Sequence, residues 1–142
     1  MQRKLKMDIE TADKVIAAAV SHAEKLNVPQ NIAVVDDAGH LVAFRRMNGA
    51  KFFSIEIAIA KAFTAAGAQK ATRDIGAATQ PGAPGFGAQA LHSGRFTTLP
   101  GGIPLVVDGE VVGAVGVSSG STAEDQQVAE AAALALGSAE TA

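Results

Sequence analysis

The amino-acid sequence predicts a single α+β domain, residues 1–142, with helices on both faces of an antiparallel sheet of about five strands. The apolar patterns follow the order helix, two strands, helix, irregular segment, two or three strands and helix. Each pair of strands is joined by a short turn, which places the two strands antiparallel. At 142 residues the chain is long enough to enclose a hydrophobic core.

The first helix is expected from about Asp8 to Leu26, where apolar residues recur at spacings of three and four. The sequence Asn27-Val28-Pro29 ends it. His22 lies roughly 90° from the centre of the apolar stripe, on its shoulder. This position is typical of a half-exposed surface histidine. The alternative is a metal ligand placed where the helix borders a groove.

A hairpin follows. Its first strand, Ile32 to Val35, is apolar on both faces, which predicts a central strand covered on both sides. Asp36-Asp37-Ala38-Gly39 has the composition of a turn. The second strand is expected from Leu41 to Met47, and Gly49 separates it from the next helix.

The second helix, about Ala50 to Ala66, is apolar on nearly every side. Such a helix is expected to be buried all round, either in a large core or between subunits. Lys61 lies within it among apolar neighbours, where an unpaired ammonium group is costly. Lys61 is therefore either a lysine whose end reaches solvent or a residue of a functional site.

The segment 67–102 is the most irregular, with a short helix expected near 72–78 and a Pro- and Gly-rich stretch at 80–87. A loop of this length is usually a lid or a binding loop, and its embedded Phe86, Leu91 and Phe96 favour ordered packing. Residues 97–99 are expected to add a short edge strand.

The clearest hairpin joins strands at 105–107 and 111–115 through Asp108-Gly109, the signature of a type I′ turn. Gly113 and Gly116 lie inside a strand, which indicates close approach by either a helix or a ligand. The last helix is expected from about Thr122 to Leu136, with Ser121 and Glu124 forming a capping box. The loop before it could offer backbone N–H groups to an anion.

Composition limits the possible partners. Hydrophobic residues make up 48% of the chain and charged residues only 18%, which favours a homo-oligomer that buries apolar surface. A net charge of −2 without a basic run argues against nucleic acid. No cysteine is present, no run is long enough to span a membrane, and the cytoplasm is the expected compartment. The three histidines lack ligand spacing, so no metal site is predicted from the spacing.

The positive charges and glycine turns predict a groove for a small anionic ligand, a carboxylate or a phosphate. Three segments are expected to converge there: the N-terminal part of the second helix, the turn at 99–102 and the loop at 116–120. If the protein is an enzyme, Lys61 or Asp36 would act as the acid or base and Arg46 as the anion anchor. The predicted ligand-binding residues are Arg46, Asn48, Lys61, Pro100, Gly101, Gly102, Ser118, Ser119 and Gly120.

Three blocks, VVDDAGHLVAFRRMNGA, KAFTA and LPGGIPLVVDGEVVGAVGVSSG, occur in this order between about Asp8 and Leu136. In these the chain resembles a family of small haem-binding proteins, domain of unknown function 336. Its members include the glycolate-operon G protein, a haem-sensing protein of streptomycetes and the C-terminal domain of the propanediol-utilisation adenosyltransferase. The resemblance implies a profilin-like fold, assembly from dimers up to octamers, and haem as a cofactor.

Two positions depart from the family pattern. Asn48 stands where the family usually has an aspartate, and Ser119 stands where it usually has a glycine. In one member the haem iron is held by a histidine on the first helix, and His22 is the candidate at that place here.

We therefore expect a haem-binding oligomer that sequesters or degrades haem. The alternatives are a cofactor-independent catabolic enzyme acting on a small carboxylated substrate and a non-catalytic accessory or scaffold protein. A Soret band on adding haemin would favour haem binding, and a small acid bound near Lys61 would favour the enzyme.

Overall fold

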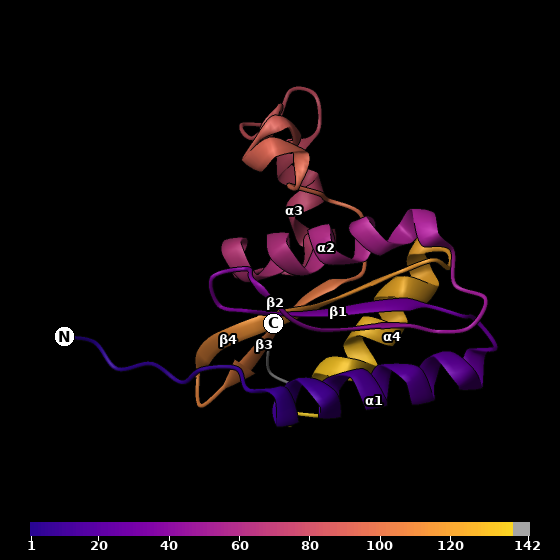
Figure 1. Ribbon diagram of the computed structural model, residues 1–142. Helices are drawn as coiled ribbons and strands as arrows, with labels where there is room; N and C mark the ends of the chain where they lie inside the picture. Colours follow the sequence, from indigo (N-terminus) through magenta and orange to yellow (C-terminus); the bar gives the residue numbers. More distant parts are fainter. Residues whose placement is uncertain (138–142) are drawn as a thin grey trace.

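The structure is a computed structural model that describes residues 1–137. One antiparallel sheet lies between two helical layers (Figure 1). Helix α2 covers one face, and helices α1 and α4 cover the other. The elements are α1 (Ile9–Leu26), β1 (Asn31–Asp36), β2 (Leu41–Arg46), η1 (Phe52–Ser54), α2 (Ile55–Ala68), α3 (Thr72–Gly76), η2 (Ala77–Thr79), η3 (Ala88–Ala90), η4 (His92–Gly94), β3 (Gly102–Val107), β4 (Glu110–Ser118) and α4 (Thr122–Leu134).

The sheet contains four strands in the described residues, in the order β2-β1-β4-β3. Strand β1 is paired on both sides, and its residues 31–35 are all buried. The central position predicted from its apolar pattern is confirmed. The predicted α+β class with helices on both faces is also confirmed.

The prediction of about five strands is wrong, because residues 97–99 do not form an edge strand. Their backbone groups bond to side chains instead of to a neighbouring strand. The N–H of Thr97 donates to the hydroxyl of Thr64, and the carbonyl of Leu99 accepts from the hydroxyl of Thr72. These bonds leave the segment as a connection between the loop and β3.

Several turns and helix caps that the sequence predicted are present in the structure. Asp108 and Gly109 have φ values of 51° and 78°, as a type I′ turn requires. Ser121 and Glu124 form the predicted capping box at α4. Asp8 caps α1 through its carboxylate, which accepts from the N–H of Thr11 at 2.8 Å. Thr72, in contrast, does not cap α3, because its hydroxyl bonds to the chain before β3.

Helix α2 faces the sheet with small residues. Its buried residues include Ala58, Ala62, Ala65 and Ala66, whereas its isoleucines are only partly buried. Within one chain, therefore, the helix is not buried all round. A methyl group on Gly116 would overlap the backbone of α2, so this glycine is explained by helix packing rather than by a ligand.

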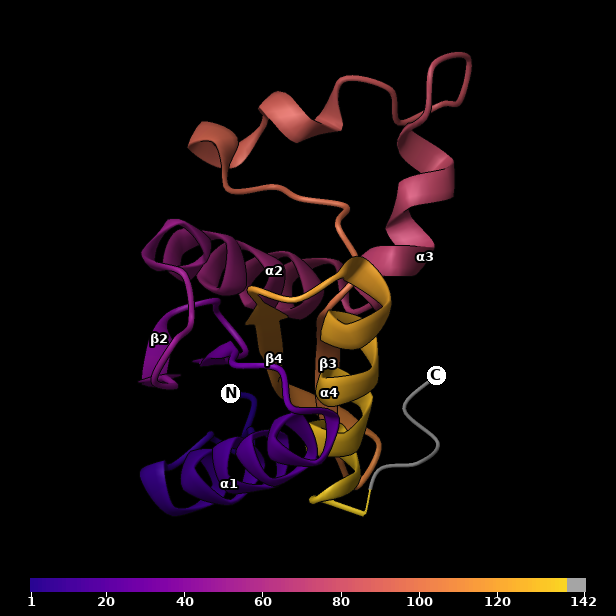
Figure 2. The same cartoon turned by 90° about the vertical axis from the view of Figure 1, so that its right-hand side faces the viewer.

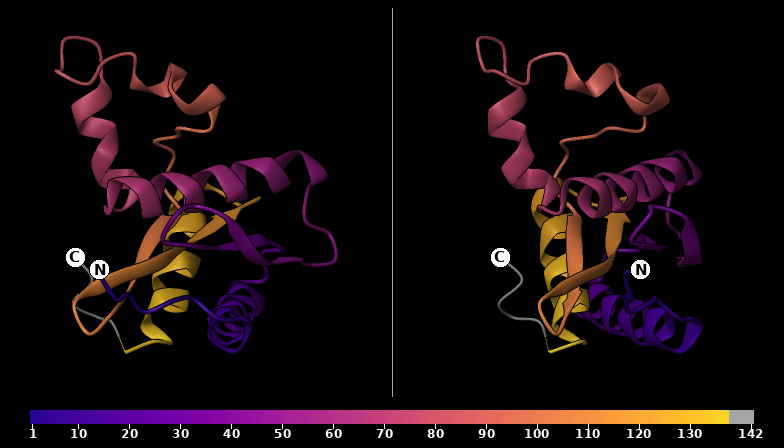
Figure 3. Two further views of the ribbon diagram at one scale, coloured as in Figure 1. Left: turned by 60° about the vertical axis from the view of Figure 1, so that its left-hand side comes forward. Right: turned by 90° about the vertical axis from the view of Figure 1, so that its left-hand side faces the viewer.

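Residues 77–97 rise from the layer of α2 and form an arm on the side away from the sheet (Figures 2 and 3). The arm consists of short helical turns joined by Gly- and Pro-rich chain. Phe86 and Leu91 on it are 65% and 56% exposed. None of the helices in the described residues has the length and apolarity needed to cross a membrane.

Candidate functional site

The ammonium group of Lys61 is paired inside the protein. The residue is only 1% exposed, and its Nζ atom donates to the carbonyl of Val117 at 2.8 Å. The same atom lies 3.0 Å from Oδ2 of Asp125, which is itself 3% exposed. Burial lowers the pKa of Lys61, and the carboxylate of Asp125 opposes this shift in part. The lysine is buried and paired, so its end does not reach solvent, and its partner comes from the last helix.

The three segments expected around Lys61 do meet at this ion pair. The N–H of Gly120 donates to Oδ1 of Asp125 at 3.0 Å, and the N–H of Gly101 donates to the side chain of Gln126 at 3.1 Å. A Cβ atom on Gly101 would lie 3.0 Å from Nζ of Lys61. The glycine thus lets the chain pack directly on the ion pair, and protein atoms fill the place expected for a ligand.

Gly102, Pro100 and Ser118 lie beside this cluster. The N–H of Gly102 donates to the hydroxyl of Thr72 at 3.0 Å, and Ser118 is buried at the end of β4. Pro100 is partly exposed and lines a neighbouring pocket. Of these three residues, Pro100 is the one placed to meet a molecule in solution.

Arg46 and Asn48 lie on the β2 side of the sheet, away from this cluster. Arg46 and Ser118 pair with Asn31 from opposite sides, so about 10 Å of sheet separates their backbones. The guanidinium of Arg46 donates to the carbonyl of Ala50 at 3.2 Å. Asn48 is exposed in the turn after β2. The structure therefore does not bring Arg46 and Lys61 to one ligand.

Ser119 explains one departure from the family pattern. Its φ value is 131°, a conformation that suits glycine better than serine. Its hydroxyl accepts a hydrogen bond from the N–H of Lys51 at 2.9 Å. The serine thus links the loop before α4 to the chain that enters α2, and the hydrogen bond offsets part of the backbone strain.

Asp36 lies at the opposite end of β1 from this cluster. Its Oδ1 atom accepts from the N–H groups of Ala38 and His40 at 3.0 and 2.9 Å. Asp36 is paired with Gly113, whereas Asn31 at the start of β1 is paired with Ser118. Five residues of strand, about 16 Å, separate the two ends. Asp36 therefore fixes its own turn and does not share a cavity with Lys61.

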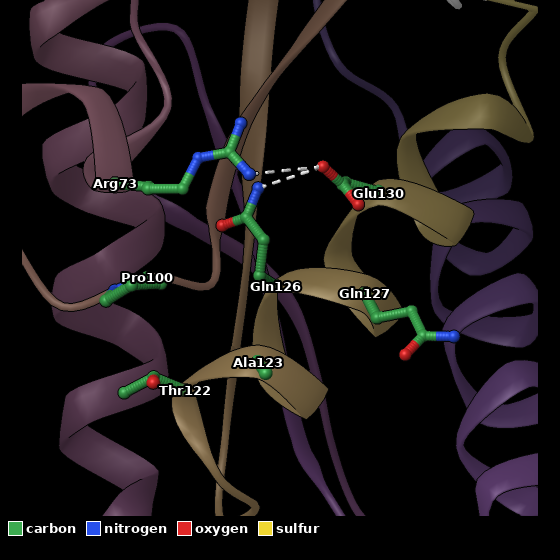
Figure 4. A pocket seen from close by; sticks show the side chains of 7 residues that line it. All are labelled: Arg73, Pro100, Thr122, Ala123, Gln126, Gln127 and Glu130. Atoms are coloured by element: carbon green, nitrogen blue, oxygen red, sulfur yellow. Dashed lines mark hydrogen bonds and ion pairs between the residues drawn. The ribbon is translucent and has the colours of Figure 1, made fainter.

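A pocket of about 450 Å³ lies between α3 and the first turns of α4. Figure 4 shows Arg73 of α3 and Glu130 of α4 extending toward one another across it, with Pro100 and Thr122 at its other end. The pocket is lined by Arg73, Pro100, Thr122, Ala123, Gln126, Gln127 and Glu130.

The ion pair in this pocket is loose. Nη1 of Arg73 lies 3.7 Å from Oε2 of Glu130, and about half of each side chain is exposed. Gln126 donates to the same carboxylate at 3.2 Å, and its other amide atom accepts from Gly101. Exposed ion pairs contribute little to stability, so Arg73 can exchange Glu130 for a ligand at small cost. Arg73 can thus supply the cationic group that the sequence placed on Lys61 and Arg46.

His22 lies on α1, across the sheet from α2. Its side chain is partly buried. The Nε2 atom is enclosed by the chain and has no hydrogen-bond partner among the described residues. Buried polar atoms nearly always have a partner in folded proteins, and His22 shares this exception with the side-chain amide of Gln30 and the amide oxygen of Asn31.

Asp125, Gln126, Arg73 and Glu130 were missed by the sequence analysis. A signal for Asp125 and Gln126 did exist: both directly follow the capping box, in the first turns of a helix expected to pack on the sheet. Arg73 and Glu130 are separated by more than 50 positions, and in the sequence each looks like an ordinary charged surface residue. No local pattern could have paired them.

The fold defines an α+β domain whose four-stranded antiparallel sheet lies between two helical layers. Comparison with known proteins identifies the family to which the chain belongs. The chain belongs to the family described as haem degrading protein, HbpS-like, which matches residues 7–134.

Three relatives illustrate the similarity. Protein GlcG of Escherichia coli (strain K12) is 40% identical over 118 residues, covering 83% of this chain and 85% of the relative. The crystal structure of Klebsiella pneumoniae protein ORFY superposes with a TM-score of 0.92 at 30% identity, covering 96% of this chain and 95% of that one. The crystal structure of the PduOC–haem complex superposes with a TM-score of 0.88 at 33% identity, covering 92% and 95%.

Proposed function

We propose that this protein binds haem and that His22 is the ligand of the haem iron. The observation that carries the proposal is the Nε2 atom of His22, which is enclosed and without a hydrogen-bond partner among the described residues. An imidazole nitrogen that spends no hydrogen bond on the protein keeps its lone pair for a metal. The family description and the haem complex of the PduOC relative support haem as the ligand.

His22 fits haem in its donor chemistry. Haem brings its own porphyrin ligands for the iron, so a single imidazole from the protein could hold it. His22 is only partly buried, but its Nε2 atom is enclosed, so the chain around it must move before haem iron can reach this nitrogen. Bound haem would supply a redox-active iron, and the family description names haem degradation. Sequestration of haem without degradation is the alternative function.

Titration with haemin tests this proposal. We expect a Soret band that saturates at a fixed haem-to-protomer ratio and a low-spin spectrum. His22→Ala should remove the low-spin spectrum and leave the far-ultraviolet circular dichroism unchanged. His40→Ala is the matched control, since His40 is exposed in the turn between β1 and β2. An unchanged spectrum in His22→Ala, or an equal loss in His40→Ala, would remove His22 from the site.

A small carboxylate is the second candidate ligand, and Arg73 is the observation that favours it. The pocket between α3 and α4 is lined by Arg73 together with Thr122 and Gln127. A guanidinium group matches the geometry of a carboxylate. Lys61 and Asp36 are engaged elsewhere, so we assign neither of them the acid or base role in this pocket.

Binding of succinate, a small dicarboxylate, tests the Arg73 pocket by calorimetry. Arg73→Met should weaken binding by tenfold or more, and Arg3→Met in the exposed N-terminal segment should leave it within about twofold. If Arg73→Met also stays within twofold, the pocket does not bind carboxylates. The accessory or scaffold alternative would then be favoured, provided that haemin does not bind either.

We propose further that the protein assembles into a homo-oligomer, in the cytoplasm. Phe52 and Phe53 at the start of the α2 layer are each 74% exposed in the single chain. Adjacent exposed aromatic residues are costly in water and are typical of a surface that another subunit covers. The partly exposed isoleucines of α2 extend this apolar surface.

A further inference from the structure

A second cavity lies on the outer side of α2. It has a volume of about 360 Å³ and is formed by the turn after β1, the C-terminal half of α2 and the end of the arm. We call it the α2 pocket and define it by Asp37, Gly39, Phe63, Gly67, His92 and Phe96. The pocket is on the opposite side of the sheet from α1 and His22.

The walls of the α2 pocket are aromatic or small. Phe63 and Phe96 supply rings, and Gly39 and Gly67 supply surface without side chains. Gly39 is required by packing, because a Cβ atom there would lie 2.7 Å from the ring of Phe63. Gly67 has no such reason: a Cβ atom there would meet nothing within 4 Å. Gly67 therefore adds no side chain to this wall, although alanine is the more favourable residue in a helix.

The backbone places His92 over this pocket at a further cost. His92 and Ser93 have φ values of 54° and 58°, and Gly94 follows at 79°. Left-handed backbone is unfavourable for residues with a Cβ atom, and two in succession are rare. The imidazole lies edge-on to the ring of Phe63, with the ring centres 5.4 Å apart. Backbone strain that fixes one side chain at the edge of a cavity is typical of a binding site.

The arm is fixed to α2 at this point. The hydroxyl of Thr64 donates to the carbonyl of Arg95 at 3.1 Å and accepts from the N–H of Thr97 at 3.0 Å. The guanidinium of Arg95 lies 4.1 Å from the centre of the Phe63 ring. These contacts hold the end of the arm against α2, so the α2 pocket is built by the fold and not by a loose loop.

Asp37 supplies the acceptor at the edge of the α2 pocket. One carboxylate oxygen, Oδ2, receives a hydrogen bond from Lys4 at 2.6 Å. Lys4 is 54% exposed and belongs to the extended N-terminal segment, so a ligand can displace it at small cost. A carboxylate beside aromatic walls is suited to a flat ring that carries N–H groups.

We propose that the α2 pocket binds a small planar aromatic molecule bearing a cationic N–H donor group, with the ring against Phe63 and Phe96 and the donor group on Asp37. His92 closes one side of the ring site. The volume, at the lower end of the range for ligand sites, fits one ring or two fused rings. This site is separate from that of haem, and either proposal can fail without the other.

Benzamidine is the probe, because its amidinium group matches a carboxylate, and benzoate is the control of equal size and opposite charge. Chemical shifts in the two-dimensional NMR spectrum of the full-length protein would report binding. We expect benzamidine to shift the resonances of Gly39, Gly67 and His92 in a saturable manner and benzoate to bind at least tenfold more weakly.

Three variants make the test specific. Gly67→Leu fills the α2 pocket where no atoms of the chain lie within 4 Å of the new Cβ, and it should weaken benzamidine at least tenfold while the protein stays folded. Lys70→Leu adds the same side chain at an exposed position outside the pocket and should change affinity less than twofold. Lys4→Ala removes the competing cation and should tighten binding.

Three results would overturn the proposal. Benzoate binding as tightly as benzamidine would contradict the role of Asp37. Equal affinity in Gly67→Leu and the unchanged protein would show that the ligand is not in the α2 pocket. Weaker binding in Lys4→Ala would likewise contradict competition for the carboxylate.

Discussion

Lys61 and Asp125 form a buried ion pair that joins α2 to α4 through the sheet. Their side chains are 2% and 4% exposed, and Lys61 also bonds to Val117 on β4. A pair of this kind is costly to desolvate, so it contributes less to stability than its short distances imply. It does define how the elements meet, because each charge is satisfied only when α2, β4 and α4 are all in place.

Replacing Lys61 alone should be strongly destabilising. Lys61→Met keeps most of the side-chain volume but leaves Asp125 as a buried carboxylate without its cation. We expect a loss on the order of 3–5 kcal/mol in the free energy of unfolding, measured with urea. The double variant Lys61→Met, Asp125→Leu should recover part of that loss. A cost below about 1 kcal/mol for the single variant would contradict this account.

The same lysine predicts a dependence of stability on alkaline pH. Burial lowers the pKa of Lys61 below its usual 10.5. Between the lowered pKa and 10.5, the unfolded chain holds a proton that the folded protein has lost, so the free energy of unfolding should rise with pH in that window. The chain has neither tyrosine nor cysteine to titrate there. The difference in stability between the unchanged protein and Lys61→Met isolates the effect, and a difference that does not vary with pH would contradict it.

Helix α2 packs in the opposite way from what the sizes of its residues suggest. Its alanines face the sheet and its larger residues face away, because Gly116 on β4 lets the helix backbone approach closely. The close approach leaves no room for large side chains on the inner face. The bulky apolar residues of α2 are consequently placed on its outer surface.

Gly116→Ala tests this packing. The new methyl group would overlap the carbonyl oxygen of Ala58 and the backbone nitrogen of Ala62, so α2 must move. We expect a loss of about 1–3 kcal/mol in the free energy of unfolding. Gly67→Ala is the control, since its methyl group meets nothing within 4 Å and should be neutral or stabilising. Equal stability of the two variants would contradict the packing argument.

The elements that sequence patterns predicted are those determined by local chemistry. The turn at Asp108-Gly109, the capping box at Ser121 and the central strand β1 all depend on neighbouring residues. Features that depend on distant partners were not predictable. Residues 97–99 look like an edge strand until Thr64 and Thr72 take their hydrogen bonds.

The candidate site follows the same division. The apolar neighbours of Lys61 left two interpretations open, an end that reaches solvent or a residue of a functional site, and the structure buries the lysine in an ion pair. Its partner could not be predicted, because Asp125 is 64 residues away and looks like an ordinary acidic residue in the first turn of a helix. The convergence of three segments was predicted, but the space at their meeting point is filled by the ion pair.

At the scale of the whole molecule, the outer surface of α2 predicts assembly. Phe52 and Phe53 lie side by side in η1 and are each 74% exposed. The double variant Phe52→Ser, Phe53→Ser should shift the protein toward smaller species in size-exclusion chromatography with light scattering. Its circular dichroism should be unchanged, because neither ring is buried in the single chain. If the protein without substitutions is a monomer at micromolar concentration, that result would contradict the proposed oligomer.

The central claim is that His22 presents its imidazole to haem iron, and chemical rescue tests it most directly. His22→Gly removes the ring and leaves a space in which free imidazole can bind the iron. We predict that the haemin complex of His22→Gly lacks the low-spin spectrum of the unchanged protein and regains it when imidazole is added. A low-spin spectrum in His22→Gly without imidazole would contradict the claim.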